Sequence, residues 1–203
     1  MNNDKKIVLL DLEKSEPYRV FSNYFTEASK CKQKSIDAIA ISSLNSSSNE
    51  VSSRFVNLKY IIGDEWIFFS NYQSPKANDF ESHDQISALI FWESINIQIR
   101  LKAKIFKSSK KISDAHFMKR SKEKNSLAIS SNQSQKISSY EGVKEKYFDV
   151  LKSKDPLTRP SYWGGYSFRP YEIEFWKGSE FRLNKRDLFT KNNSVWIHYI
   201  LEP

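Results

Sequence analysis

The chain has 203 residues, of which 39% are hydrophobic and 28% are charged, a composition typical of one globular domain and not of a disordered chain. Lysine and arginine outnumber aspartate and glutamate by 32 to 24, but the lysines are spread among acidic residues and serines, so we expect no nucleic-acid partner. The single cysteine, Cys31, excludes an internal disulfide, and no apolar run approaches the ~20 residues that span a membrane, so we expect a cytoplasmic protein without membrane segments.

The N-terminal half predicts helices among a series of strands. Residues 16–32 carry apolar side chains at spacings of three and four, the pattern of a helix with one buried face. Ser74 and Pro75 suit the first turn of a short second helix that ends at Phe80. Strict alternation of apolar and polar residues over 95–102 predicts a strand with one buried face. Further strands are expected at 36–43, 51–60, 66–70 and 86–92.

The C-terminal half predicts two more helices, at 112–120 and 140–152, and then a proline-bearing loop at 155–160. Strands are expected at 163–169, 171–176, 187–190 and 195–201, separated by turn-forming glycine and asparagine residues. Many strands with peripheral helices predict an α+β barrel. We expect it to form a single domain over residues 17–203, preceded by an N-terminal extension over residues 1–16.

The usual catalytic motifs are absent from the sequence. It contains no GxGxxG or GxxxxGK[ST] loop, so side chains would have to hold any nucleotide phosphate. The three histidines lie far apart and lack metal-ligand spacing, so we expect no metal site. What remains is a set of polar residues near strand ends, each of which taken alone is typical of a solvated surface.

An ordered series of short motifs resembles the pyridoxamine 5′-phosphate oxidase family. Arg54 to Lys59 resembles its R-x-V-x-L-K strand, and Phe69-Ser70-Asn71 followed by Ser74-Pro75-Lys76 resembles its Y-[ST]-N and S-R-K segments. Further matches are Gln133-Ser134 to Q-S, Trp163-Gly164-Gly165 to W-G-G, Ile173 to Trp176 to I-E-F-W, and Arg182-Leu183 with Arg186 to R-L-H-D-R. The shared order extends from Pro17 to Pro203 and so covers nearly the whole chain.

This resemblance implies an FMN-binding split β-barrel with peripheral helices, a homodimer whose clefts hold FMN between both subunits. The cofactor contacts would be Arg54, Phe55, Val56, Asn57, Leu58, Lys59, Phe69, Ser70, Lys76, Gln98, Gln133, Ser134, Trp176 and Arg186. The substrate phosphate would meet Lys59, His116, Arg120 and Lys124, and the catalytic residues beside the substrate ring would be Arg182 and Asn184. Arginine and lysine suit this task because they bind phosphate through charge-assisted hydrogen bonds.

Several positions depart from the family's pattern. Pro75 stands in place of an arginine, and His116 and Lys124 stand in place of a tyrosine and a serine that contact the substrate phosphate. Asn184 replaces a histidine beside the reacting carbon, and residues 127–129 replace a G-A-W segment. The flavin half of the site is therefore expected to be retained and the substrate half altered.

The leading interpretation is an FMN-dependent oxidase that converts pyridoxine or pyridoxamine 5′-phosphate to pyridoxal 5′-phosphate. Hydride would pass to FMN, and O₂ would reoxidise the flavin and yield hydrogen peroxide. Lys59 favours a phosphorylated substrate, because a substrate without phosphate gives no reason to keep a cation there. The alternatives are a flavin oxidase of the same fold that acts on another compound, such as a phenazine precursor, and a non-catalytic flavin- or pyridoxal-phosphate-binding protein.

Overall fold

The structure is a computed structural model that describes residues 7–153 and 156–203, so residue 155 of the expected proline-bearing loop lies outside the described part. Its helices are α1 (Glu16–Lys30), α2 (Pro75–Ser82), α3 (Lys110–Lys119), α4 (Lys122–Ser130) and α5 (Tyr140–Ser153), with short 3-10 turns η2 (Glu93–Ile95) and η3 (Glu180–Arg182). Its strands are β1 (Val8–Leu10), β2 (Ala38–Asn45), β3 (Glu50–Asn57), β4 (Tyr60–Ile62), β5 (Glu65–Asn71), β6 (Gln85–Trp92), β7 (Ile97–Lys107), β8 (Trp163–Lys177), β9 (Lys185–Asn192) and β10 (Val195–Leu201).

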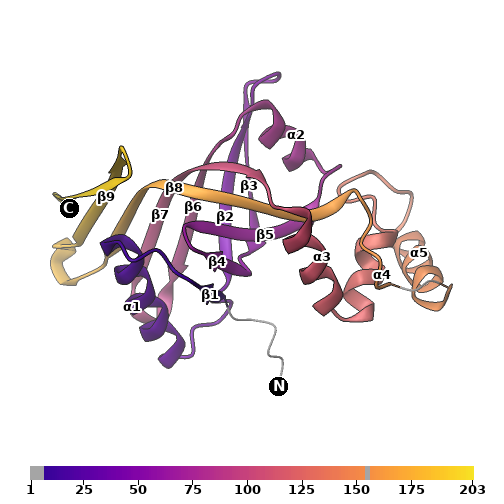
Figure 1. Ribbon diagram of the computed structural model, residues 1–203, viewed down its shortest axis with the longest axis horizontal. Helices are drawn as coiled ribbons and strands as arrows, with labels where there is room; N and C mark the ends of the chain where they lie inside the picture. The colour runs from indigo at the N-terminus through magenta and orange to yellow at the C-terminus, as the bar shows by residue number, and fades with distance from the viewer. Residues whose placement is uncertain (1–6, 154–155) are drawn as a thin grey trace.

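The described strands form one ten-stranded sheet in the order β1-β4-β5-β8-β7-β6-β2-β3, from which β9 and β10 branch at β8. The long strand β8 pairs with β7 along one edge. Its other edge is shared by β5, which pairs with its first residues, and β9, which pairs with its last residues. The sheet therefore extends in two directions from β8, and Figure 1 shows β9 at the opposite end of the molecule from α3, α4 and α5.

The core forms where the alternating strands meet α1. The apolar residues of β7 are buried at every second position, including Ile97, Ile99 and Leu101, as the alternation predicts. The buried face of α1 brings Phe21 against Trp66 of β5, with ring centroids 4.6 Å apart. This packing fixes the sheet on which the candidate site is built.

Two glycines in β8 let α3 approach the sheet closely. A Cβ atom at Gly165 would lie 2.6 Å from Ser108 Oγ, closer than such atoms pack, and 3.2 Å from the Phe69 ring, which is a tight contact. The Gly165 N–H instead donates a hydrogen bond to Ser113 Oγ of α3 over 3.1 Å. The W-G-G motif thus seats α3, which carries His116 and leads into Arg120, against β5 and β8.

The structure confirms the expected α+β class and the four expected helices, with shifts of a few residues at their ends. The strand expected at 51–60 is two strands, β3 and β4. The strand expected from residue 95 begins at Ile97, because Asn96 takes a left-handed backbone conformation, with φ 51°, after a 3-10 turn. The strands expected at 163–169 and 171–176 are one, and a register shift against β7 beside Pro170 accommodates the missing proline N–H.

Two elements were not expected. Helix α4 buries Asn125 and Ser126, so its sequence lacks an apolar stripe; the Asn125 amide instead donates to the carbonyl oxygens of Phe117 and Pro156. Strand β1 lies within the expected N-terminal extension and pairs in parallel with β4, and the neighbouring Ile7 is buried. Residues 7–10 therefore contribute to the sheet and its core.

Candidate active site

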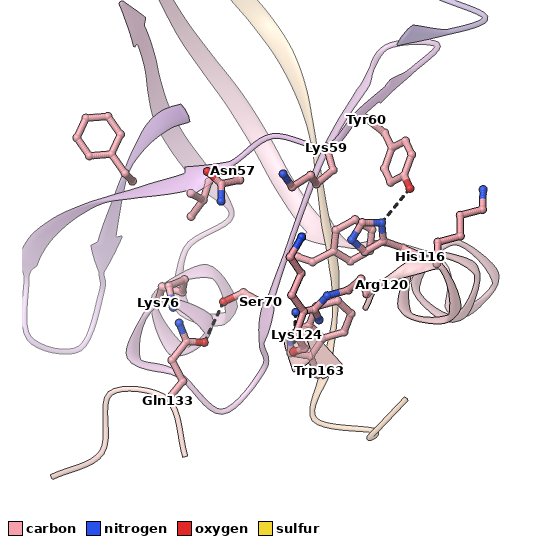
Figure 2. A pocket seen from close by; sticks show the side chains of 14 residues that line it. Asn57, Lys59, Tyr60, Ser70, Lys76, His116, Arg120, Lys124, Gln133 and Trp163 are labelled. Atoms are coloured by element: carbon pink, nitrogen blue, oxygen red, sulfur yellow. Dashed lines mark hydrogen bonds between the residues drawn. The ribbon is translucent and has the colours of Figure 1, made fainter. Parts of the chain in front are cut away.

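A cavity of about 490 Å³ lies where strands β3, β4 and β5 meet helices α2, α3 and α4 (Figure 2), a volume typical of small-molecule sites. It is lined by Phe55, Val56, Asn57, Lys59, Tyr60, Phe69, Ser70, Lys76, His116, Lys119, Arg120, Lys124, Gln133 and Trp163. These residues come from separate segments of the chain, which the sheet and the seating of α3 bring together.

Parallel rings form one wall of the cavity. Phe69 and His116 stack with centroids 3.7 Å apart and an interplanar angle of 10°. Trp163 lies parallel to Phe69, with centroids 5.4 Å apart. The Arg120 guanidinium lies 4.4 Å from the Trp163 ring centroid, and it donates to the Lys124 carbonyl oxygen over 2.9 Å. Stacked aromatic groups beside a positioned guanidinium suit a ligand that combines an aromatic ring with an anionic group.

The charge of the lining has one sign. Five basic side chains line the cavity, namely Lys59, Lys76, Lys119, Arg120 and Lys124. Among the described residues, no Asp or Glu lines it. A concave surface with charges of one sign concentrates ions of the opposite sign, so the cavity favours an anionic ligand.

Two of these lysines lie in different surroundings. The Lys59 ammonium is 2.8 Å from Oδ2 of the buried Asp37, so this lysine already has a carboxylate partner within the subunit. Lys76 is buried and donates to Ser74 Oγ over 3.0 Å. Burial, with the nearby charge of Arg54, lowers the pKa of Lys76 to about 8, while Asp79 acts in the opposite direction. A bound phosphate near Lys76 would return the charge stabilisation that burial removes.

The Gln133 side chain is held in the cavity by β5. Its amide oxygen accepts from Ser70 Oγ over 3.4 Å and from the Asn71 backbone N–H over 3.3 Å. These two bonds explain why Gln133, from the loop after α4, reaches the cavity.

The cavity gathers many of the residues that the motifs indicated. Of the expected cofactor contacts it contains Phe55, Val56, Asn57, Lys59, Phe69, Ser70, Lys76 and Gln133, and of the expected substrate-phosphate contacts it contains Lys59, His116, Arg120 and Lys124. Expected flavin contacts and expected substrate-phosphate contacts from the segments between β3 and the loop after α4 therefore line the same cavity.

Three expected contacts lie beside this cavity without lining it. The Arg54 guanidinium donates to Ser43 Oγ over 2.6 Å and to Asp79 Oδ2 over 3.2 Å. Leu58 is fully buried in the core. Ser134, next to Gln133, lines a separate depression between the α4–α5 loop and α5.

The remaining expected residues form a second cluster. Gln98 pairs with Trp176 across β7 and β8, and Trp176 pairs with Arg186 across β8 and β9, so the three lie in one cross-strand row. Arg182 and Asn184 lie in the turn that leads from β8 to β9. Phe69 pairs with Gly165, eleven positions before Trp176, and at about 3.3 Å per residue this is on the order of 35 Å along β8. The second cluster is thus remote from the cavity of its own subunit.

Three lining residues were not assigned a role from the sequence: Tyr60, Lys119 and Trp163. Lys119 had a usable signal, because positions 116, 119 and 120 share one face of a helix. Trp163 stood in a quoted motif. Tyr60 had no such signal, since its contact with His116 joins residues 56 positions apart.

Comparison with known proteins shows the family of this chain. The chain is 35% identical over 190 residues to the pyridoxine/pyridoxamine 5′-phosphate oxidase of Leptospira biflexa, which covers 93% of this chain and 89% of the relative. The chain belongs to the pyridoxine/pyridoxamine 5′-phosphate oxidase family. It is also 34% identical to the pyridoxine/pyridoxamine 5′-phosphate oxidase of Aliarcobacter butzleri, over 95% of this chain and 92% of the relative. Residues 163–203 match the family model described as the pyridoxine 5′-phosphate oxidase C-terminal dimerisation region.

Solved structures confirm the expected split-barrel fold. PhzG from Burkholderia lata, in complex with tetrahydrophenazine-1-carboxylic acid, superposes with a TM-score of 0.88 at 24% identity and covers 93% of both chains. A pyridoxamine 5′-phosphate oxidase-related, FMN-binding protein from Nostoc punctiforme has a TM-score of 0.77 at 12% identity, covering 94% of this chain and all of its own. At these identities the likeness establishes the fold of the chain and not its substrate.

Within residues 7–153 and 156–203, no helix is long and apolar enough to cross a membrane. In the same part of the chain, no group of three or more His, Cys, Asp and Glu side chains is placed to hold a metal ion.

Proposed function

We propose that the chain is an FMN-dependent oxidase that converts pyridoxine or pyridoxamine 5′-phosphate to pyridoxal 5′-phosphate, with O₂ as the electron acceptor. The observation that carries the proposal is the cavity itself, where stacked aromatic rings adjoin a basic lining at positions of the family motifs. Both ligands of such an enzyme combine an aromatic ring with a phosphate. FMN, when bound, would accept the hydride and return the electrons to O₂.

The donors of the cavity fit FMN. Its phosphate needs cationic donors, and Lys76 is a buried ammonium in a site without a Gly-rich loop. Arg54 supports this subsite from behind, because Asp79 holds its guanidinium near Lys76. Gln133 and Ser70 offer polar groups at the ring edge, where an amide can meet the acceptors and donors of a flavin.

We propose a homodimer in which the second cluster of each subunit completes the cavity of the other. One subunit places Gln98, Trp176 and Arg186 on the order of 35 Å along β8 from its own cavity, so a single chain cannot join them. The match of residues 163–203 to a dimerisation region supports this arrangement. In the dimer, Arg182 and Asn184 would lie beside the substrate ring of the partner's site.

The phosphate of the substrate is assigned to Arg120, with His116 and Lys124 beside it. Arg120 is oriented by the Trp163 ring and the Lys124 carbonyl, so its donors are preorganised for a phosphate. Lys59 supports a phosphorylated substrate less strongly than the sequence suggested, because its ammonium already pairs with Asp37. The proposal of a phosphorylated substrate therefore rests mainly on Arg120.

A flavin oxidase that acts on another ring compound is the second candidate. Asn184 favours it, because an amide cannot exchange a proton near neutral pH as the histidine of the family pattern can. Pro75, which supplies no phosphate donor, points the same way, and PhzG shows that this fold accommodates a tricyclic acid. The non-catalytic binder is the remaining alternative, and only a turnover measurement separates it.

The test is reduction of the bound flavin without oxygen. The protein reconstituted with FMN should lose its visible flavin absorption on addition of pyridoxine 5′-phosphate, and much more slowly with pyridoxine. Arg120→Ala should lower the affinity for the phosphorylated substrate by roughly ten- to a hundred-fold, since it removes a charge-assisted contact. Lys110→Ala, at the start of the helix that leads into Arg120 but outside the cavity, is the matched control.

Two results would decide against the vitamin B6 substrate. Equal rates of flavin reduction by pyridoxine 5′-phosphate and by pyridoxine would contradict the role of Arg120 in binding the substrate phosphate. A flavin that dithionite reduces but pyridoxine 5′-phosphate does not, even in Asn184→His, would leave the second candidate in front.

A further inference from the structure

The His116 ring is held from several sides within the cavity. Its Nδ1 atom lies 2.9 Å from the Tyr60 hydroxyl. Phe69 covers one face of the ring at 3.7 Å between centroids, and the Tyr60 ring meets it edge-on at 5.4 Å. These contacts leave the imidazole little freedom to rotate.

The direction of the ring follows from these contacts. Figure 2 shows Tyr60 on one side of the His116 ring and Lys59 and Lys124 on the other. Because the two ring nitrogens of an imidazole lie on different edges, the contact of Nδ1 with Tyr60 directs Nε2 toward the basic lining. A ligand anion among those cations would therefore meet Nε2.

We propose that Tyr60 is a positioning residue of the anion subsite, whose hydroxyl holds His116 so that Nε2 donates an N–H to the phosphate of the bound substrate. Tyr60 touches His116 and acts on the ligand only through it. The inference deepens the proposed function and rests on it for the identity of the anion as the substrate phosphate.

The chemistry of a phenol explains why tyrosine suits this position. A phosphate dianion offers acceptors only, so it selects the His116 form that carries a proton on Nε2. In neutral His116, the Tyr60 O–H donates to Nδ1 and the ring proton lies on Nε2. In charged His116, Nδ1–H donates to the phenol oxygen and Nε2 still carries a proton. The same hydroxyl therefore supports donation from Nε2 in both protonation states.

The surroundings of Tyr60 keep its hydroxyl protonated. The side chain is partly buried, and burial raises its pKa above the ordinary value of 10. The Tyr60 ring also packs against Phe69 with centroids 6.1 Å apart, and this contact helps to fix the position of the hydroxyl in the cavity. A phenylalanine would keep this packing and lose only the contact with Nδ1.

The experiment compares Tyr60→Phe with the wild type and with Tyr171→Phe, a tyrosine of β8 outside the cavity. Imidazole nitrogen NMR of the FMN-bound protein, assigned with His116→Gln, reports which nitrogen carries the proton. With inorganic phosphate added, His116 of the wild type should carry it on Nε2. Without phosphate, the signals of Tyr60→Phe should show a mixture of tautomers, whereas the wild type and Tyr171→Phe should both keep the proton on Nε2.

Steady-state kinetics provides the second readout. Tyr60→Phe should raise KM for pyridoxine 5′-phosphate about three- to ten-fold, the loss of a modest hydrogen-bond contribution, with kcat changed less than about two-fold. Since Tyr60 acts through His116, the double variant Tyr60→Phe/His116→Gln should be no worse than His116→Gln.

The two readouts separate the possible failures. Neutral His116 with its proton on Nδ1 in the phosphate-bound wild type would overturn the inference, as would additive effects in the double variant. If pyridoxine 5′-phosphate is not oxidised at all, the proposed function fails, and the NMR signals with inorganic phosphate still decide the role of Tyr60. A Tyr60→Phe variant that loses FMN leaves the wild-type spectrum as the deciding measurement.

Discussion

Lys76 combines a positive charge with burial, and its carboxylate neighbour, Asp79, is engaged by Arg54 and Ser43. The pKa of its ammonium is lowered from the ordinary value of 10.5 to about 8, chiefly by burial. In this range the unfolded chain holds the proton more tightly than the folded one, so the charge opposes folding at neutral pH. Such a group contributes to ligand binding at the expense of the stability of the ligand-free protein.

We therefore expect Lys76→Met to lower the affinity for FMN by about ten-fold or more. The same change should raise the unfolding temperature of the flavin-free protein at pH 7. In the wild type the Lys76 charge is lost as the pH rises through about 8, so FMN affinity should fall above that pH and stay flat just below it, until the phosphate is protonated near about pH 6. Flavin fluorescence titrations at several pH values, with thermal unfolding, measure both effects. An equal loss of affinity in Lys110→Met would contradict the assignment.

For single residues, the sequence indicated candidate site positions but not the side chains that contact them. The motifs placed Lys59 and Arg54 near a phosphate, and the structure brings Asp37 and Asp79 to them from segments 22 and 25 residues away. Neither aspartate belongs to a motif, so no local pattern announced these ion pairs. The same holds for Tyr60 and His116, which a tertiary contact joins.

At the scale of elements, β8 organises the site. Its first residues pair with β5 and seat α3, and its last residues pair with β9 and carry the second cluster. Alternation and turn residues were enough to predict most strands. They failed for β8, where Pro170 indicated a break that a register shift absorbs. They also failed for α4, which buries Asn125 and Ser126 in place of an apolar stripe and in which Asn125 donates tertiary hydrogen bonds.

The seating of α3 gives a prediction about stability. Gly165→Ala should destabilise the fold by about 1–3 kcal/mol, because the added Cβ would lie 2.6 Å from Ser108 Oγ and 2.8 Å from Ser108 Cβ. Gly142→Ala in α5 is the matched control, since its Cβ would be 3.5 Å from the nearest side-chain atoms, those of Ile137 and Ser139, and alanine favours a helix by up to about 1 kcal/mol. Urea unfolding measures both, and equal stability of Gly165→Ala and the wild type would disprove the close approach.

At the scale of the whole molecule, the subunit exposes apolar side chains near both clusters. Phe55, which lines the cavity, is 76% exposed, and Phe181, beside Arg182, is 91% exposed. Val195 and Ile200 of the outermost strand β10 are also largely exposed. Large apolar side chains that gather at functional positions are typical of an interface, and the dimerisation region of the family spans Phe181 and β10. The resemblance to the family implied a homodimer, and the many aromatic residues of the chain suit an extensive interface; the dimer itself stays a prediction.

Mixing of variants tests whether two subunits build each site. Lys76→Met impairs the cavity, and Arg186→Gln impairs the second cluster while keeping a donor toward Glu174. If each site combines the cavity of one subunit with the second cluster of the other, a mixed dimer has one intact site and one doubly impaired site. Random exchange of equal amounts of the two variants should then restore about a quarter of the wild-type FMN sites, whereas each variant alone has none intact.

The comparison is made after unfolding and refolding the two variants together, with light scattering to establish a mass of twice 23.8 kDa. Refolding each variant alone and then mixing is the control, because a stable dimer exchanges subunits slowly. If both clusters served the same site within one subunit, no mixed dimer would contain an intact site and flavin binding would stay at the level of the single variants. Restoration to about a quarter therefore excludes a site within one chain, and it does so without reference to which substrate the enzyme oxidises.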